Sequence, residues 1–462
     1  MRRLIQTVCM GIAATSLSVG CDWKKLDDAV EKAPVLSVGA PGGYLGNDVG
    51  RLIVALPPPA ERPEVAARFF VASITKVAAA VVELDAKGKA TVINVPDTVL
   101  TPLNSTPIGS VALALRPDEA FPSVLLGVPD FKTAEIRNGA MFRLKISPGN
   151  VFTLDAGLLP PPTLAVGAKA QQFSGIQGYG RGVASGNVSG NAAFDDWVVA
   201  GNAGVALIED GAANLPQVLT PPSACALDLN PIRLGHLYEL SRAVAIGDLM
   251  DLPGGEIAVG VPDAVGAGKV VLLHRSETEL GCPTTITVPG SPSFGSAVVA
   301  GDLNGDGKAD LVVGAPQDKV YVFFGPFTPA VPPTPSLIIN PPAGAQAADF
   351  GARLALMELD AASPGPEIVI AAPNYPAGGK TGTGALFVFK ADGTQSPLTI
   401  SDIDPEANSG LGEAIAVVPF RNPSCAAGPD RPVLVAGANE EVFTYFALPG
   451  ALPDPRCFPA AK

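Results

Sequence analysis

The sequence is poor in the residues on which most enzymes and nucleic-acid-binding proteins depend. Only 16% of its 462 residues are charged, the net charge is −13, and there are two histidines. A phosphate backbone demands a basic protein face, so nucleic acid is not an expected partner. Two histidines cannot furnish a three-histidine zinc site, and none of the six cysteines stands in a Cys-x-x-Cys spacing.

What the chain has in quantity is apolar residues broken by turn residues. The hydrophobic share is 47%, and 51 glycines and 47 prolines fall largely between short apolar runs that are rich in β-branched residues. Such runs predict strands, and the residues between them predict turns. We therefore expect an all-β protein with a packed core.

The most informative stretch is residues 294–316. Asp302, Asn304 and Asp306 alternate along it, Gly307 follows where the backbone must turn, and Asp310 opens an apolar run. Alternating side-chain oxygens suit Ca²⁺, which takes about six to eight oxygen ligands, and the Lys308 carbonyl would add one more. An EF-hand would continue into a helix, whereas this loop leads into a strand. The pattern predicts a Ca²⁺ loop between two β-strands.

Phe294-Gly295, the cation loop and Gly314-Ala315-Pro316 together resemble the FG-GAP repeat of integrin α-subunits. Similar segments recur around seven small residues: Gly39, Gly127, Gly201, Gly260, Gly314, Ala371 and Gly437. Periodic similarity of this kind is typical of propellers, because one sheet cannot bury its own two faces. The resemblance predicts a seven-bladed β-propeller of FG-GAP repeats.

The resemblance also implies a function and an orientation. Propellers of this family bind or display and carry no chemistry of their own. The loop-rich face would hold a protein or glycan ligand, and the Ca²⁺ loop would stiffen a blade on the opposite face. Loops that connect strands are where binding residues gather. We thus expect a non-enzymatic adhesion or interaction scaffold.

The repeats predict one propeller over residues 34–462. Its first copy is expected at Val38–Pro41 with the strand Gly50–Val54, and the long step to the second copy predicts an insertion near residues 56–108. A ring must join its first and last blades, and this first copy lacks a Phe-Gly strand. The expected closure uses a terminal segment, either residues 27–32 or the tail after Phe446.

Other repeats carry weaker versions of the cation loop. The fourth has Asp248 and Glu256 at the first and last positions, but Met250 and Leu252 stand between them, so this loop is expected to keep its turn without an ion. The third offers mostly neutral oxygens, and affinity falls as carboxylates are lost; its candidates are Asn187, Ser189, Asn191 and Asp196. One full site is expected.

The N-terminus is typical of an export signal over residues 1–20, with two arginines and then an apolar run. Ending in Gly20-Cys21, it resembles a bacterial lipoprotein signal, in which Cys21 becomes the lipidated first residue and residues 21–33 form a tether. A lipid anchor would hold the protein at the membrane of the cell envelope. The alternative is ordinary cleavage and secretion.

Export permits disulfides among the four remaining cysteines, which allow three pairings. Proximity favours Cys225 with Cys282, and Cys425 with Cys457 as a clasp on the last blade. Free buried thiols are the alternative.

A rival interpretation is a serine hydrolase of the penicillin-binding type. Ser73 and Lys76 match Ser-x-x-Lys, Lys380 opens a Lys-Thr-Gly triplet, and Ser185-Gly186-Asn187 could supply the middle element. However, the propeller interpretation assigns Lys380 and Ser185 to separate repeats, where they could not converge on Ser73.

Overall fold

The structure is a computed structural model of the chain. It describes residues 35–36, 49–86, 88–115, 119, 121–133, 136–137, 139–155, 178–191, 195–201, 204–209, 217–219, 225, 243–262, 267–276, 279–291, 293–316, 318–359, 364–401, 407–421, 431–438 and 441–445. The chain divides into two units, Met1–Ala33 with Ala461–Lys462, and Pro34–Ala460. All the described residues belong to the second unit. The expected signal, Cys21 and tether, and Cys425 and Cys457, lie outside the described residues.

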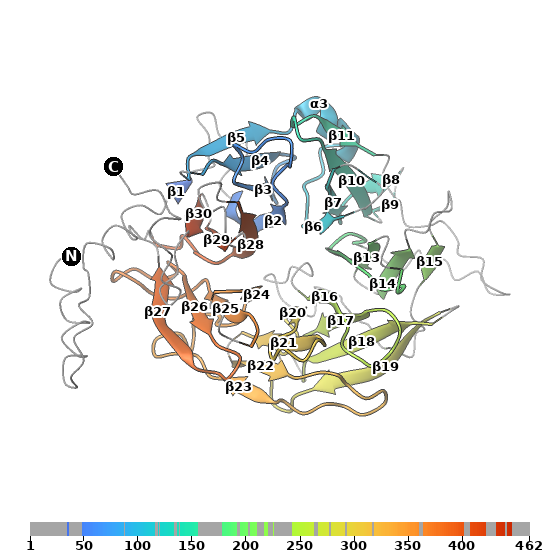
Figure 1. Cartoon of the computed structure of the whole chain (residues 1–462), viewed down its shortest axis with the longest axis vertical. Helices are drawn as coiled ribbons and strands as arrows, with labels where there is room; N and C mark the ends of the chain where they lie inside the picture. Colours follow the sequence, from blue (N-terminus) through green and yellow to red (C-terminus); the bar gives the residue numbers. More distant parts are fainter. Residues whose placement is uncertain are drawn as a thin grey trace. The chain divides into compact units, whose positions relative to one another are not determined.

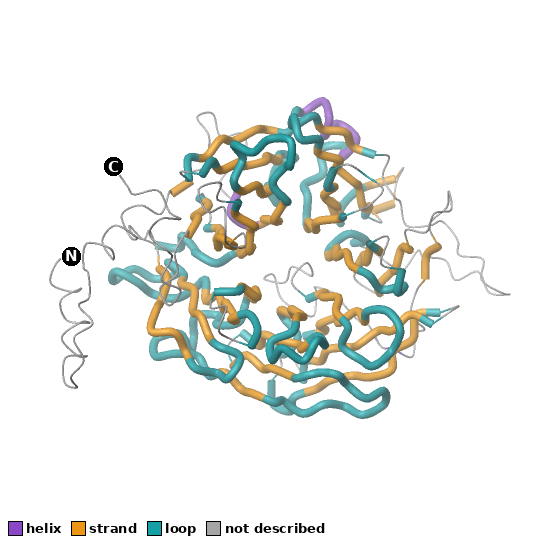
Figure 2. Tube along the Cα trace, in the orientation of Figure 1, coloured by secondary structure: helices purple, strands orange, loops and turns teal. Residues whose placement is uncertain are grey.

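Seven four-stranded antiparallel sheets build this unit, as Figures 1 and 2 show. The first three blades are, from the innermost strand outwards, β2 (Leu52–Leu56), β3 (Ala67–Ala72), β4 (Ala79–Leu84) and β5 (Ala90–Asn94); β6 (Ser110–Ala114), β7 (Ser123–Val128), β10 (Ala140–Ile146) and β11 (Phe152–Leu154); and β12 (Gly182–Gly186), β13 (Asp196–Gly201), β14 (Gly204–Glu209) and β15 (Gln217–Leu219).

The next three blades follow the same order. They are β16 (Val244–Gly247), β17 (Glu256–Val261), β18 (Lys269–Arg275) and β19 (Leu280–Thr287); β20 (Ala297–Gly301), β21 (Asp310–Ala315), β22 (Lys319–Phe323) and β23 (Leu337–Ile339); and β24 (Arg353–Met357), β25 (Glu367–Ala372), β26 (Ala385–Phe389) and β27 (Gln395–Ser401). The prediction of a seven-bladed β-propeller is confirmed.

The seventh blade differs, because its outer strand comes from the other end of the chain. It consists of β28 (Ala414–Phe420), β29 (Arg431–Gly437), β30 (Val442–Tyr445) and β1 (Val35–Leu36). The remaining described elements are short: η1 (Val49–Arg51), α3 (Asp97–Leu100), η2 (Thr101–Leu103) and the hairpin β8 (Lys132–Thr133) with β9 (Ile136–Arg137). None of these helices is long and apolar enough to span a membrane.

The core lies between the blades. In six blades the second strand, such as β21, is buried along its whole length, because neighbouring blades cover both of its faces. Among the described residues, each pair of adjacent blades encloses one hydrophobic cluster, including the pair formed by the seventh and first blades. Neighbouring innermost strands also contact each other all the way round. The ring is therefore closed.

The Gly-Ala-Pro triplet of one blade lies against the Phe-Gly pair of the next blade. A Cβ added to Gly314 would lie 2.1 Å from the carbonyl oxygen of Gly351 in the next blade, and Gly351 itself has φ +93°. Only glycine fits so close a backbone approach. Phe294 is fully buried beside Tyr321 and Phe323, with ring centroids 5.5 and 6.0 Å apart. The glycines thus set the blade spacing, and the phenylalanine fills the core beside them.

The first blade corrects the predicted boundaries. Residues 52–94 form a complete sheet, so the expected insertion near 56–108 is wrong, and the strand assigned to Gly50–Val54 is the innermost strand of the blade. A Cβ on Gly50 would lie 1.9 Å from the oxygen of Ala438, the approach made elsewhere by the Phe-Gly glycine. The second strand of this blade ends in Val71-Ala72-Ser73 rather than Gly-Ala-Pro. The repeat was missed because its motif has diverged.

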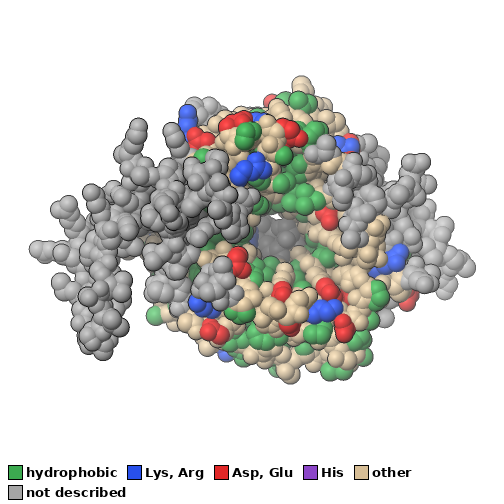
Figure 3. All heavy atoms as spheres, in the orientation of Figure 1, with side chains coloured by type: hydrophobic (Ala, Val, Ile, Leu, Met, Phe, Trp, Pro, Cys, Tyr) green, Lys and Arg blue, Asp and Glu red, His purple; other side chains and the backbone are tan. Residues whose placement is uncertain are grey.

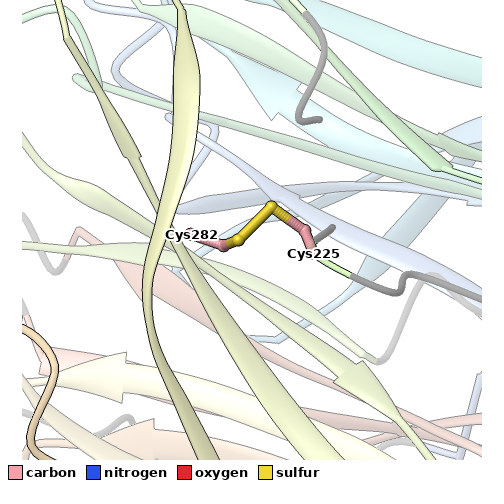
Figure 4. The surroundings of a disulfide bond; sticks show 2 residues. All are labelled: Cys225 and Cys282. Atoms are coloured by element: carbon pink, nitrogen blue, oxygen red, sulfur yellow. A yellow bond between two sulfur atoms is a disulfide. The ribbon is translucent and has the colours of Figure 1, made fainter. Parts of the chain in front are cut away.

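Ring closure uses an N-terminal segment, but not the one expected. Val35 pairs with Phe443 and Leu36 with Val442, so β1 becomes the outer strand of the last blade. The structure also joins Cys225 to Cys282 on β19, with the two Cα atoms 5.7 Å apart (Figure 4). This disulfide ties residue 225, which follows the third blade in the chain, to the outer strand of the fourth.

Candidate cation loop of the fifth blade

The predicted cation loop connects the two inner strands of the fifth blade. Gly301 pairs with Asp310 at its base, so β20 and β21 hold its two ends together. Gly305 and Gly307 have φ of +78° and +85°, which the tight turn requires of them. The structure therefore brings together the five predicted residues, Asp302, Asn304, Asp306, Lys308 and Asp310, on one loop.

The side-chain oxygens of this loop accept hydrogen bonds from backbone amides. Asp302 accepts hydrogen bonds from the N–H groups of Gly305 (2.7 Å), Asp306 (3.2 Å) and Gly307 (2.8 Å). Asp306 accepts one from the N–H of Lys308 at 2.8 Å and another from the Asn304 amide at 2.9 Å. The side chains thus point into the turn rather than outward.

Asp310 is the buried end of the loop. Its side chain is fully buried, and its two oxygens accept from the N–H groups of Leu303 and Gly325, each at 2.8 Å. Burial raises the pKa of Asp310, the two amide hydrogen bonds oppose this, and Asp306 and Asp302 add to the rise. A cation near these three carboxylates would remove that repulsion.

The one lysine of the loop points away from these carboxylates. Lys308 Nζ lies 3.0 Å from Asp248 Oδ2 and 3.1 Å from Asp251 Oδ1, both in the corresponding loop of the fourth blade. Within the described residues, no Lys, Arg or His side chain forms an ion pair with Asp302, Asp306 or Asp310. Three acidic groups therefore share a small volume without a cationic side chain.

The donor set fits a hard cation, although its side chains are not arranged around one. In the part of the chain that the structure describes, no group of three or more His, Cys, Asp and Glu side chains is placed to hold a metal ion. Each carboxylate keeps further lone pairs beyond its amide hydrogen bonds. Oxygen donors alone are what Ca²⁺ prefers. Binding would require Asp302 and Asp306 to turn modestly within the loop.

Comparison of the blades shows a role for the last acid that the sequence patterns did not reveal. Asp196 accepts from the N–H groups of Val188 and Ser189, and Glu256 from those of Leu249 and Met250. Glu367 accepts from Leu359 at 2.9 Å. Like Asp310, each of these acids opens the second strand of its blade. The recurrence of an acid at the start of the second strand was the signal available in the sequence. The shared role of these acids is to cap the preceding loop.

The fourth blade carries this cap, with Asp248 at the first ligand position but Met250 and Leu252 at the two middle positions. Glu256 is fully buried, and burial raises its pKa to about 7. Its Oε1 lies 3.0 Å from Nδ1 of His274, whose pKa is lowered, again chiefly by burial. Near neutral pH both groups can be uncharged, with the carboxylic acid donating to the imidazole. Leu249 and Met250 fill the core here.

The residues of the rival hydrolase are distributed over three blades. Ser73 is fully buried at the turn between β3 and β4, and its Oγ accepts from the N–H groups of Thr75 (3.2 Å) and Lys76 (2.9 Å). Lys380 lies in the β25–β26 connection, and Ser185 lies on β12. The structure therefore gives Ser73 a turn-forming role and assigns its supposed partners to other sheets.

The seven blades and the loop of the fifth define the class of protein: the chain is a β-propeller that carries an FG-GAP repeat, and residues 294–323 match the model of that repeat family. It is 31% identical over 197 residues to integrin alpha-IIb of Homo sapiens, covering 37% of this chain and 17% of that protein. It is 31% identical over 105 residues to integrin alpha-4 of Xenopus laevis, covering 20% and 10%. The matched segments thus span a small part of these relatives.

Among solved structures, two crystal structures of BBS1N in complex with ARL6DN have similar chains. The one soaked with lead gives a TM-score of 0.48 at 12% identity and covers 86% of this chain and 91% of that one. The one soaked with mercury gives 0.47 at 11%, with 88% and 95% covered.

Proposed function

We propose that the protein is a non-enzymatic binding or adhesion scaffold of the cell envelope whose fifth blade is stiffened by Ca²⁺. The observation that carries the proposal is the Asp302–Asp310 loop, which concentrates three carboxylates, an amide and a carbonyl within an FG-GAP repeat. The fold is like that of integrin α-subunits, which supports binding rather than chemistry. Fold alone does not establish function, so each part needs its own test.

The ligand would be a protein or a glycan held by the face opposite the Ca²⁺ loop. That face carries the connections between the second and third strands, of which those at residues 73–78 and 373–384 are described in full. A lipid on Cys21 would tether the propeller to the membrane, with secretion as the alternative. Binding to a glycan array and to envelope proteins should weaken when residues 376–380 are replaced by a short glycine linker, and stay unchanged on replacing residues of the opposite face.

Calorimetry tests the cation site directly. One Ca²⁺ should bind per chain, and at about 100-fold excess over Kd it should stabilise the fold by about 2.7 kcal/mol, since it binds the folded state alone. Asp306→Ala should abolish this gain, because it removes an exposed carboxylate that would bind the ion; the hydrogen bonds that Asp306 accepts from Lys308 and Asn304 stay within the loop. Asp392→Ala, an exposed acid on another blade, is the control and should keep it. No heat of binding in the unaltered protein would contradict the site.

A fluorescent penicillin tests the absence of hydrolase chemistry. An acylated serine requires an activated and reachable hydroxyl, whereas Ser73 is fully buried in a turn. We expect no labelling. Covalent labelling that disappears in Ser73→Ala would instead support the enzyme.

A further inference from the structure

The large hydrophobic side chains that stand exposed among the described residues lie mainly on one face of the ring. This cation-loop face carries the connections from the first to the second strand of each blade and from the third to the fourth. Four of the five such side chains lie in these connections: Leu115 is 45% exposed, Phe121 38%, Val151 66% and Val331 55%. The fifth, Ile338, lies on the outer strand β23. None lies in the described connections of the opposite face.

The strand order shows how widely these residues are spread. Leu115 follows β6 and Phe121 comes just before β7, so both belong to the connection of the two inner strands of the second blade. Val151 lies in the β10–β11 connection of the same blade, and Val331 in the β22–β23 connection of the fifth. Two blades separate the second from the fifth on one side of the ring and three on the other. The four residues therefore do not form a single patch. Figure 3 shows one face of the ring with hydrophobic side chains spread around the central opening.

The described neighbours of these side chains are uncharged or carry paired charges. The connection of residues 324–336 is rich in proline and has no charged residue, and residues 147–151 read Ser-Pro-Gly-Asn-Val. In the described part of the β6–β7 connection, Glu119 forms ion pairs with Arg143 and Lys145. Apolar surface at these positions can therefore leave water without the desolvation of an unpaired charge among these neighbours.

The N-terminal strand points to the same face. The third strand of each blade runs towards the cation-loop face, and β30 is the third strand of the seventh blade. Because β1 pairs antiparallel with β30, it runs away from this face, and the chain enters it at Val35 from the cation-loop side. A lipid on Cys21 would thus be connected to the ring at the face that exposes the apolar side chains.

We propose that the cation-loop face docks on the membrane surface, with Leu115, Phe121, Val151 and Val331 inserted at the boundary between lipid headgroups and acyl chains. A bilayer is flat, so it can contact the second and fifth blades at once, whereas a peptide or small ligand would fill one patch. The anchor keeps the ring close to the surface, so a small gain from each inserted side chain is sufficient. The inference rests on the proposed lipid anchor and adds which face meets the membrane.

The charge of this face determines the kind of lipid that it fits. Asp251 and Asp306 are exposed on it, and Lys308 pairs with the first of them. Exposed acids are repelled by the negative potential of anionic lipids, whereas a zwitterionic surface such as phosphatidylcholine exerts no such repulsion. A zwitterionic surface is therefore the fitting one. The opposite face would then point away from the membrane, where a protein or glycan can reach it.

Tryptophan fluorescence tests this orientation on the mature chain. The chain carries Cys21→Ser and an N-terminal histidine tag, which holds it on phosphatidylcholine vesicles that contain a nickel-chelating lipid and bromine-labelled acyl chains. Bromine quenches tryptophan only on close approach, so Phe121→Trp and Val151→Trp should lose emission compared with unlabelled vesicles. Ile338→Trp, comparably exposed but on the outer strand, is the matched control and should keep its emission. The two native tryptophans contribute equally to all variants.

Co-sedimentation of the untagged Cys21→Ser chain with phosphatidylcholine vesicles measures the strength of docking. Replacing both Phe121 and Val151 by serine should weaken binding by about tenfold or more, because both side chains lose their apolar surface. Ile338→Ser should leave binding unchanged, and melting curves should show that all variants are folded. Vesicles of phosphatidylglycerol should bind the unaltered face more weakly than phosphatidylcholine.

Three outcomes would overturn the proposal. They are equal quenching of Phe121→Trp and Ile338→Trp, full binding by the double serine variant, and a blue shift of the Phe121→Trp emission without bromine quenching, which would indicate a second copy of the chain on this face. Neither experiment uses a lipid on Cys21, Ca²⁺ or a glycan. A failure here would therefore leave the proposed anchor, cation site and ligand face to their own tests.

Discussion

The loops of the fourth and fifth blades occupy the same place in their repeats, yet they are stabilised differently. Both begin with an aspartate and end with a buried acid that caps the turn, Glu256 in one and Asp310 in the other. Both loops bury the leucine that follows the first aspartate, Leu249 or Leu303. At the two middle ligand positions the fourth loop has the apolar Met250 and Leu252, and the fifth has the polar Asn304 and Asp306. The same loop backbone therefore accommodates either apolar or polar side chains between its two ends.

The two loops are also joined. The ammonium of Lys308 reaches from the fifth loop to Asp248 and Asp251 of the fourth, and the N–H of Ala309 donates to the carbonyl of Asp248 at 2.9 Å. The Lys308 ammonium thus pairs with the acids of the fourth loop, and the Lys308 carbonyl would bind Ca²⁺ in the fifth. The comparison teaches that the buried cap is the common structural element, and that the proposed Ca²⁺ ligands of the fifth loop are an addition to it.

The largest expected effect comes from removing the cap of the fifth loop. Asp310→Ala leaves the N–H groups of Leu303 and Gly325 without their acceptor, which should lower the free energy of unfolding by about 2–4 kcal/mol even without Ca²⁺. Glu256→Ala should cost a similar amount in the fourth loop. Urea unfolding in a chelator measures both. The exposed Asp306→Ala is the control, and a loss as large as that of Asp310→Ala would contradict the distinction between cap and ligand.

A smaller effect is expected from the pH dependence of the fourth loop. The pKa of Glu256 rises from 4.5 to about 7 on folding, so the folded state holds its proton more tightly. The stability contributed is fully present below about pH 4.5 and is lost as pH rises through about 7, by up to about 3 kcal/mol. Glu256→Gln should remove this loss. Between about pH 5 and pH 8 the free energy of unfolding of the variant should therefore rise relative to that of the unaltered protein. If the difference in free energy of unfolding between the two proteins stays constant across that range, the raised pKa of Glu256 is refuted.

The smallest effect is expected from Lys308→Met, which keeps the carbonyl and removes the ammonium. Its contacts with Asp248 and Asp251 are exposed, and ion pairs of this kind contribute little and are screened by salt. We expect a slight fall in Tm at low salt that disappears at high salt, with Ca²⁺ affinity nearly unchanged. Lys390→Met, on another blade, is the control. A large fall would mean that the link between the loops is essential to the ring.

Several predictions came directly from residue patterns because the pattern and the structure are local. Six of the seven repeats were found where the structure has them, since Gly314 and its counterparts must be small to let the next blade approach. The five predicted donor residues fall on one loop because they are close in sequence. The first repeat was misplaced because Ala72-Ser73 replaces the motif, and Val38–Pro41, which carries a similar motif, lies outside the described residues.

The sequence by itself determined the fold class, six of the seven blades and the loop that gathers oxygen donors, because glycine spacing, apolar runs and alternating acids act over a few residues. The tertiary structure alone decided the pairing of β1 with β30 and the reach of Lys308 to another blade. These depend on residues that are far apart in the chain and become neighbours only when the ring closes, and no local pattern records that closure.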